Sequence, residues 1–154
     1  MTNPTSPPEG TPDGIYLSIV VPLFNEEESL EPLCEKIDVV LQELGRPAEV
    51  IFIDDGSTDD SYAVIEGLAP RFGWLRAVRF RRNNHKAAAL ATGFREARGE
   101  LIVTMDADLQ DDPAEIPNLI AALSTDNDLV SGWKKKRHDP ISKRAPSKVF
   151  NLVT

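Results

Sequence analysis

The chain is 154 residues long and carries 17 Lys and Arg against 25 Asp and Glu, a formal net charge of −8 at pH 7. This length suits one packed domain and is short for two. The acidic balance argues against a protein that coats nucleic acid, so no nucleic acid partner is expected. The charge is unevenly divided, because residues 134–148 hold seven of the basic residues and one acidic residue. The sequence therefore predicts an acidic body with a basic end.

Cysteine content and hydropathy indicate the compartment. Cys34 is the only cysteine, so no intramolecular disulfide can form, and a reduced, cytoplasmic setting is favoured. It is most simply a small buried apolar residue, with a thiol nucleophile as the alternative. No apolar run approaches the roughly 18 residues that cross a bilayer, and the N-terminus lacks a signal-peptide pattern. We expect the chain as given to be soluble and uncleaved.

Strand-like and helix-like segments alternate after a Pro-rich start. Residues 1–14 are predicted to be a flexible leader, residues 15–133 a folded core, and residues 134–154 a basic, incomplete segment. In chain order we expect a strand at 17–23, a helix at 26–44, a strand at 50–53, a helix through 68, a strand at 75–80, a helix at 86–97, a strand at 101–105, a helix from 112 to about 123, and a short strand at 128–131. Apolar strands separated by amphipathic helices predict an α/β fold, with a mostly parallel sheet covered by helices on both faces.

Acidic residues follow two of the predicted strands. Asp54 and Asp55 end the second strand, and Asp106 and Asp108 follow the fourth. Ligands of open α/β sheets bind beyond the carboxyl ends of the strands, where four converging carboxylates call for a compensating cation. Asp106 and Asp108 can face the same side and share one ion, and carboxylate oxygens suit Mg²⁺ or Mn²⁺ better than zinc. A diphosphate is the expected cargo, and a solvated Asp-x-Asp turn is the alternative.

Two further groups of polar residues each allow two interpretations. Asp54 and Asp55 either form a helix-capping turn or accept hydrogen bonds from a nucleobase and ribose. Arg81, Arg82 and Lys86 either form a solvated basic loop or contact phosphate or base. No G-x-G-x-x-G follows the first strand and no phosphate-binding Lys-Ser/Thr loop occurs, so metal and side chains must meet the phosphate charge.

Five segments of the sequence resemble family 2 inverting glycosyltransferases of the GT-A fold. Within that family the chain is similar to the branch of dolichyl-phosphate mannose synthase and the bacterial polyprenyl-phosphate glycosyltransferases. The segments are Val20–Glu27, Phe52–Asp59, Asn84–Leu90, Met105–Pro113 and Val130–Lys134. The resemblance implies a Rossmann-like nucleotide-sugar-binding domain and metal-dependent transfer of a sugar, from a UDP- or GDP-linked donor to a polyprenyl or dolichyl phosphate.

The resemblance also implies roles for particular residues. Asp106 and Asp108, together with Gln110, would hold the metal on the diphosphate, and Lys134 or Arg137 would neutralise the leaving diphosphate or the acceptor phosphate. The residues expected to bind the donor are Pro22, Phe24, Glu26, Asp54, Asp55, Lys86 and Asp106. One position departs from the pattern, because His85 stands where this branch usually has a glycine before the lysine.

The ionisation of the acceptor and the basic end of the chain bear on the mechanism. A phosphate monoester is ionised near pH 7, so in-line attack on the anomeric carbon needs leaving-group stabilisation and orientation and no strong base. The residues from 134 to 148 form either a solvated loop or a surface for the acceptor phosphate and anionic lipid, at the cytoplasmic face of a membrane. The alternatives are a truncated nucleotide-sugar-binding module of a longer protein, and a phosphoacceptor receiver domain. The receiver domain fits worse, because its acid pair should follow the first strand.

Overall fold

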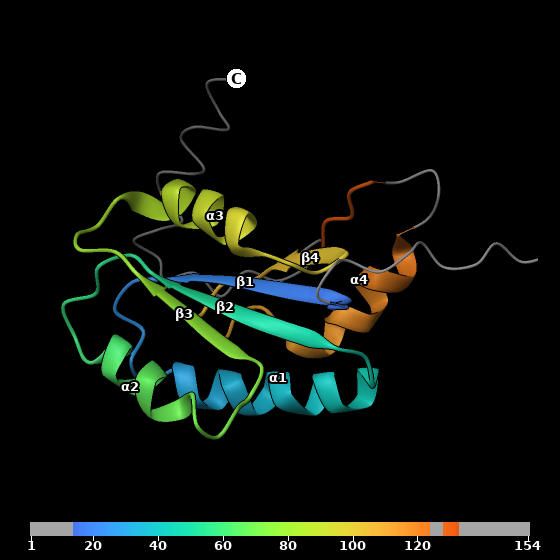
Figure 1. Ribbon diagram of the computed structural model, residues 1–154, viewed down its shortest axis with the longest axis horizontal. Coiled ribbons are helices and arrows are strands. Elements are labelled where there is room, and N and C mark those ends of the chain that lie inside the picture. Colours follow the sequence, from blue (N-terminus) through green and yellow to red (C-terminus); the bar gives the residue numbers. More distant parts are fainter. Residues whose placement is uncertain (1–13, 124–127, 133–154) are drawn as a thin grey trace, which may run out of the picture.

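The computed structural model describes residues 14–123 and 128–132. The predicted leader up to residue 13 and the basic segment from residue 134 lie outside the described residues. Within them, four strands form one sheet in the order β3-β2-β1-β4 (Figure 1). The strands are β1 (Leu17–Leu23), β2 (Ala48–Asp54), β3 (Leu75–Arg79) and β4 (Leu101–Thr104).

All pairings in this sheet are parallel, as predicted. β1 lies in the centre and pairs with β2 along its whole length, from Leu17↔Ala48 to Leu23↔Asp54. On its other side β1 pairs with β4 only as far as Val20↔Thr104. The chain therefore builds outward from β1 to β3 and then returns to the opposite side of β1 to form β4. This reversal of direction between β1 and β4 is the topological switch point of the sheet.

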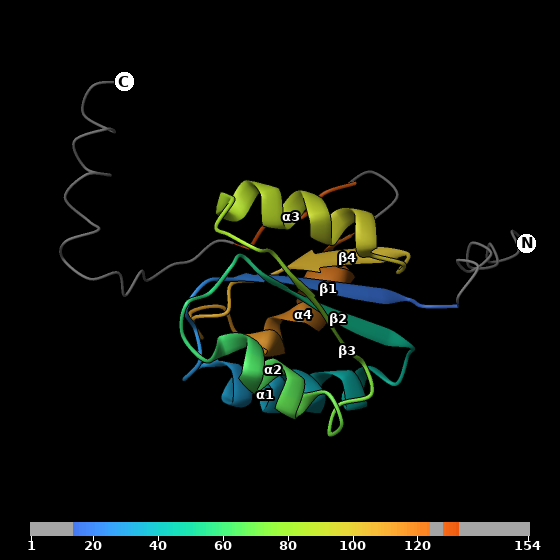
Figure 2. The same ribbon diagram turned by 60° about the vertical axis from the view of Figure 1, so that its left-hand side comes forward.

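Helices cover both faces of the sheet (Figures 1 and 2). α3 (His85–Glu96) packs on one face, against β1 and β2, while α1 (Leu30–Leu44) and α2 (Ser61–Leu68) lie on the other. A 3₁₀ turn, η1 (Pro113–Glu115), leads into α4 (Ile116–Ala122), and both contact α1. The predicted α/β architecture with helices on both faces is thus confirmed.

Alternation along the central strands explains the two layers. Successive side chains of a strand point to opposite faces, and in β1 the residues Leu17, Ile19, Val21 and Leu23 pack in the core under α1 and α2. Val20 points the other way, into a smaller cluster with Ala89 of α3. β1 is buried along its whole length because helices cover both of its faces.

Cys34 belongs to the larger core. Its side chain is fully buried, and burial raises the pKa of the thiol to about 12. The thiol stays protonated near neutral pH, so it is a packing residue, as its simplest interpretation predicted, and not a nucleophile.

A buried carboxylate ties the amino ends of the strands together. Glu49 of β2 accepts hydrogen bonds from Ser18 Oγ at 2.8 Å, from Arg76 Nη1 at 2.7 Å and from the backbone N–H of Arg98 at 2.8 Å. Burial acts to raise the pKa of Glu49, but these hydrogen bonds outweigh it and lower that pKa below its ordinary value. The cluster fixes the start of β4 beside β1, at the edge of the sheet opposite to the carboxyl ends.

Two helix boundaries differ from the prediction. The first helix begins at Leu30 and not at residue 26. The residues before it form a turn in which Ser29 N–H donates to the carbonyl oxygen of Glu26, and the N–H groups of Glu26 and Glu27 bond this turn to Ser61 and Asp59. The last helix begins as a 3₁₀ turn after Asp112, whose carboxylate caps it by accepting from Ala114 N–H. Pro117 has no N–H to donate to Pro113, so α-helical bonding starts one turn later than predicted.

The predicted strand at 128–131 is wrong. None of these residues is in a strand, and Leu129 is 86% exposed. This segment has only two large apolar side chains, since Asp128 and Ser131 are polar. Their burial would not offset the conformational entropy lost when a strand forms at the edge of β4. Among the helices of the described residues, none combines the length and the apolar character needed to span a bilayer.

Candidate functional site

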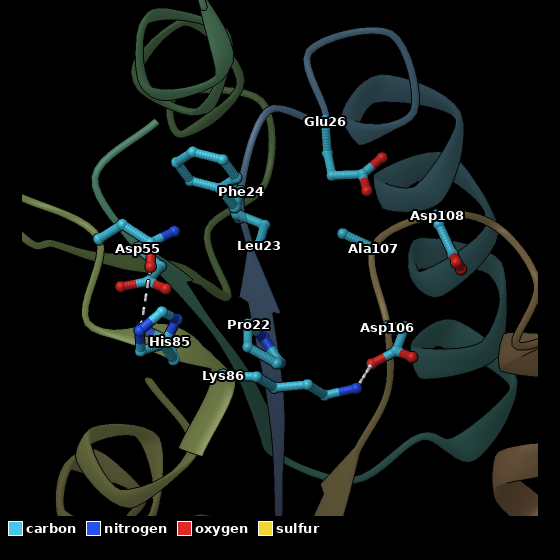
Figure 3. Close-up of a pocket in the computed structure, with 11 residues that line it drawn as sticks. Pro22, Leu23, Phe24, Glu26, Asp55, His85, Lys86, Asp106, Ala107 and Asp108 are labelled. Atoms are coloured by element: carbon cyan, nitrogen blue, oxygen red, sulfur yellow. Dashed lines mark hydrogen bonds and ion pairs between the residues drawn. The ribbon is translucent and has the colours of Figure 1, made fainter. Parts of the chain in front are cut away.

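An open cleft of about 290 Å³ lies at the carboxyl ends of the strands, beside the switch point between β1 and β4 (Figure 3). This volume is at the lower end of the roughly 300–1,000 Å³ of small-molecule sites. The residues that line it are Pro22, Leu23, Phe24, Glu26, Asp55, Asn83, His85, Lys86, Asp106, Ala107 and Asp108. Four loops that are distant in sequence thus meet at one place.

The cleft opens because β4 leaves β1 early. The last bond between them is donated by Met105 N–H to the carbonyl oxygen of Val20, at 3.1 Å, whereas β1 continues to Leu23. Pro22 lies just beyond this point, and because proline has no N–H, it loses no bond to the departing strand. The side chain of Pro22 forms the floor of the cleft between the two diverging strands.

Hydrogen bonds between the β1–α1 and β2–α2 loops hold the wall that carries Phe24 and Glu26. Asn25 has a φ of +55°, a left-handed conformation that asparagine tolerates better than most residues. Its N–H donates to Ser57 Oγ at 2.9 Å, and its Oδ1 accepts from Thr58 N–H at 2.8 Å. Each loop therefore supplies donors and acceptors to the other, and Phe24 is left 42% exposed above the cleft.

The two acidic residues at the end of β2 have different environments. Asp55 lines the cleft and is almost fully buried, and its Oδ1 accepts from the backbone N–H of Asn84 at 2.6 Å. Asp54 is fully buried and does not line the cleft. Its Oδ1 accepts from Ser57 N–H at 2.8 Å, and Arg79 Nε lies 3.3 Å from its Oδ2. Asp54 thus shapes the turn behind the cleft, while Asp55 faces the cavity.

The loop between β3 and α3 passes close to the turn after β2. A Cβ on Gly56 would lie 2.6 Å from the backbone carbonyl carbon of Arg82, so only glycine permits this approach. His85 begins α3 with a φ of +71°, and its N–H donates to Asn83 Oδ1 at 3.1 Å. The position where the sequence resemblance leads us to expect glycine therefore has a backbone conformation that favours glycine. His85 adopts it and places its imidazole in the wall of the cleft.

Lys86 and Asp106 form an ion pair across the floor of the cleft (Figure 3). Asp106 donates its N–H to Asp111 Oδ2 at 2.8 Å, and Asp108 Oδ1 accepts from Gln110 N–H at 3.1 Å. These bonds fold the loop after β4, so that Asp106 and Asp108 both line the cleft. Gln110 does not line it.

The carboxylates of the cleft fit a hard divalent cation. Asp106 and Asp108 provide oxygen ligands, which Mg²⁺ and Mn²⁺ prefer. Nowhere in the described residues do three His, Cys, Asp or Glu side chains gather closely enough to hold an ion by themselves. Mg²⁺ is usually held by one or two carboxylates together with substrate phosphates and water, so this sparse set of ligands suits a cation that arrives with a diphosphate.

Most of the predicted site residues meet in this cleft. Those that line it are Pro22, Phe24, Glu26, Asp55, Lys86, Asp106 and Asp108. Lys134 and Arg137 lie outside the described residues. The sequence reasoning assigned no role to Ser61, which is fully buried and accepts from Glu26 N–H at 2.9 Å. A serine before an apolar helix is typical of a helix cap, and nothing in the sequence signals that its hydroxyl serves another loop.

Comparisons with known proteins identify a family and relatives of this chain. The family model described as Glycosyl transferase family 2 matches residues 18–152. An undecaprenyl-phosphate 4-deoxy-4-formamido-L-arabinose transferase of Pseudomonas aeruginosa (strain LESB58) is 39% identical over 89% of the chain and 41% of its own length. A dodecaprenyl-phosphate galacturonate synthase of Rhizobium johnstonii is 41% identical over 99% of the chain and 47% of its own length. The chain thus spans less than half the length of these relatives.

Solved structures show the same architecture. A mannosyltransferase from Pyrobaculum calidifontis, in complex with GDP-Man and Mn²⁺, has a TM-score of 0.51 and 33% identity, over 60% of this chain and 27% of that one. A glucosyl-3-phosphoglycerate synthase of Mycobacterium tuberculosis has a TM-score of 0.56 and 27% identity, over 70% of this chain and 40% of that one. Both similarities are to the part of a larger glycosyltransferase that this chain covers.

Proposed function

Because the chain belongs to glycosyl transferase family 2, we propose that it forms the nucleotide-sugar-binding site of an enzyme that transfers a sugar to a polyprenyl phosphate. The observation that carries this proposal is the meeting of Phe24, Asp55, Asp106 and Asp108 in one cleft at the switch point of the sheet. An exposed aromatic ring and a carboxylate at one wall suit a nucleobase and ribose. Two carboxylates at the other wall suit a diphosphate with its cation.

The donor enters with its base beside Phe24 and Asp55 and its diphosphate between Lys86 and the Asp106–Asp108 loop. Support for a nucleotide sugar comes from the mannosyltransferase solved with GDP-Man and Mn²⁺. Support for a lipid phosphate acceptor comes from the relatives named for undecaprenyl and dodecaprenyl phosphate.

Asp106 and Asp108 would hold a Mg²⁺ or Mn²⁺ ion, with Gln110 a further predicted ligand, and the ion would neutralise charge on the leaving diphosphate. Lys86 adds a positive charge at the floor of the cleft. The acceptor phosphate attacks the anomeric carbon in line with the departing diphosphate, which inverts the configuration there. Since that phosphate is already ionised near neutral pH, the site orients and screens the two reactants and needs no strong base.

The basic segment that contains Lys134 and Arg137 completes the proposal. These cations are suited to the acceptor phosphate and to anionic lipid, each contributing on the order of 1 kcal/mol near a charged membrane surface. We accordingly place the reaction of the whole protein at the cytoplasmic face of a membrane.

Binding of the donor is tested first, by the shift of the thermal midpoint with UDP, GDP and their sugars, with and without Mn²⁺. A ligand that binds only the folded state raises the midpoint as its concentration rises. We expect a Mn²⁺-dependent shift that Asp108→Asn abolishes. Glu43→Gln, an equal charge change on an exposed residue near the C-terminal end of α1, should keep it. Equal shifts with and without Mn²⁺ would refute the metal-dependent donor site.

Transfer is tested separately, by incubating the chain with the nucleotide sugar that binds, Mn²⁺ and undecaprenyl phosphate. Glycosylated lipid with inverted anomeric configuration is the expected product. Metal-dependent binding without any transfer would assign this chain the second candidate role, a donor-binding module. The partial coverage of the relatives favours measuring both outcomes, since the chain spans 41% of the arabinose transferase and 47% of the galacturonate synthase.

A further inference from the structure

One ion pair in the cleft involves a residue proposed to bind metal. The ammonium group of Lys86 contacts Oδ1 of Asp106 (Figure 3). Lys86 comes from the first turn of α3 and reaches past the end of β1 to the loop after β4. Among the described residues that line the cleft, it is the only Lys or Arg.

A divalent cation and this ammonium group compete for the same carboxylate. The lysine ammonium is a donor without acceptor capacity, so it cannot take part in coordination and only repels a second cation. The side chains of Lys86 and Asp106 are 59% and 37% exposed, so the pair is partly screened by solvent. The competition is therefore moderate in strength and easily shifted by a ligand with more negative charge.

A donor diphosphate is such a ligand. It offers the lysine several charged oxygens in place of one carboxylate, and charge-assisted bonds to phosphate are among the stronger hydrogen bonds in proteins. The flexible four-carbon stem lets the ammonium group move without its backbone. That backbone is held, since Asn84 N–H donates to Asp55 and His85 N–H donates to Asn83. Only the side chain of Lys86 has to move when the ligand enters.

We propose that Lys86 is a positioning residue that couples metal binding to donor binding. Without a nucleotide it holds Asp106 and weakens the binding of the cation. When a diphosphate enters, Lys86 moves to the phosphate oxygens and leaves Asp106 to the cation. Metal and diphosphate then bind with positive cooperativity, and by linkage each increases the affinity for the other by the same factor. This inference rests on the proposed metal-dependent donor site.

The test is a Mn²⁺ titration in which the electron paramagnetic resonance signal of the free ion is measured, first without nucleotide and then with UDP or GDP. Without nucleotide, Lys86→Met should bind Mn²⁺ about two- to fivefold more tightly than the wild type, the range of an exposed ion pair. With nucleotide, the variant should gain less affinity than the wild type gains. Lys86→Gln, also uncharged, should behave like Lys86→Met, and Lys86→Arg should restore the competition.

Lys36→Met is the matched control, because Lys36 is an exposed lysine of α1 that does not line the cleft. It should leave both titrations unchanged. Unchanged or weaker binding of Mn²⁺ alone by both Lys86→Met and Lys86→Gln would overturn the inference. Failure of the proposed donor site has a different signature, in which the wild type retains no Mn²⁺ even with UDP and GDP present.

Discussion

The backbone of His85 gives the most direct test of the site's geometry. Its φ of +71° lies in the left-handed region, where an L-residue other than glycine pays roughly 1–2 kcal/mol. At an ordinary helix position the order is reversed, since glycine is about 0.5–1 kcal/mol less stable than alanine. Replacing His85 by glycine and by alanine therefore distinguishes a left-handed residue 85 from an ordinary helical one. Both variants lack the imidazole, and they differ in the conformational freedom of the backbone.

We expect His85→Gly to be more stable than His85→Ala by about 1 kcal/mol, because only the glycine variant is relieved of strain. The matched control is Ala63, an exposed residue of α2, where Ala63→Gly should lose about 0.5–1 kcal/mol. Urea unfolding measures both differences as shifts of the midpoint at constant slope. If His85→Ala proves as stable as His85→Gly, the left-handed conformation at residue 85 is refuted.

The same pair of variants shows what the imidazole does. Nucleotide affinity reduced equally in His85→Gly and His85→Ala would assign the side chain a contact with the donor. Affinity equal to the wild type in both would leave His85 as a surface residue at the start of a helix.

Three further substitutions test the contacts that hold the amino ends of the strands and the loops around the cleft. Glu49→Gln should cost about 1.5–3 kcal/mol in the free energy of unfolding at pH 7. Hydrogen bonds lower the pKa of Glu49 in the folded state. The stabilisation by the Glu49 carboxylate is therefore present above the pKa of Glu49 in the unfolded chain, and it is lost as the pH falls through the pKa in the folded protein. The urea midpoints of wild type and variant should then converge in acid. Gly56→Ala would place a Cβ 2.6 Å from the backbone of the β3–α3 loop, so it should lower the urea midpoint and abolish nucleotide binding. Gly67→Ala is the control, because its Cβ meets nothing within 4 Å, and it should do neither. Ser61→Ala removes the acceptor of Glu26 N–H and should cost about 1–3 kcal/mol and weaken nucleotide binding in calorimetry; unchanged affinity would show that this bond does not position the cleft wall.

The sheet and its layers were predictable because they follow from local pattern. Apolar, β-branched runs such as 17–23 and 50–53 are typical of strands that are covered on both faces, and parallel strands place their carboxyl ends at one edge. That edge is where the structure has its cleft. Asp106 and Asp108 could therefore be assigned to one site from their position after a strand.

The interior of the site was less predictable, since it depends on contacts between segments more than 25 residues apart. Asp54 and Asp55 are adjacent acids in the sequence, yet one faces the turn behind the cleft and the other faces the cavity. Which of the two points inward is decided by the pleat of β2 and by the bond from Asn84, 29 residues away. The start of α1 was predicted wrongly for the same reason, because Glu26 and Glu27, in the turn before it, are bonded to Ser61 and Asp59, more than 30 residues away.

Backbone strain in this protein is concentrated around the cleft. The described non-glycine residues with positive φ are Asn25 and Leu109, in the loops after β1 and β4, and His85, the first residue of α3. Each adjoins a residue that lines the cleft: Glu26, Lys86 or Asp108. Such conformations persist only where surrounding contacts enforce them. Asn25 is enforced by its bonds to the β2–α2 loop, and His85 by the bonds of its neighbours. The fold thus holds three residues in less favourable conformations, each next to a charged residue that lines the same cleft.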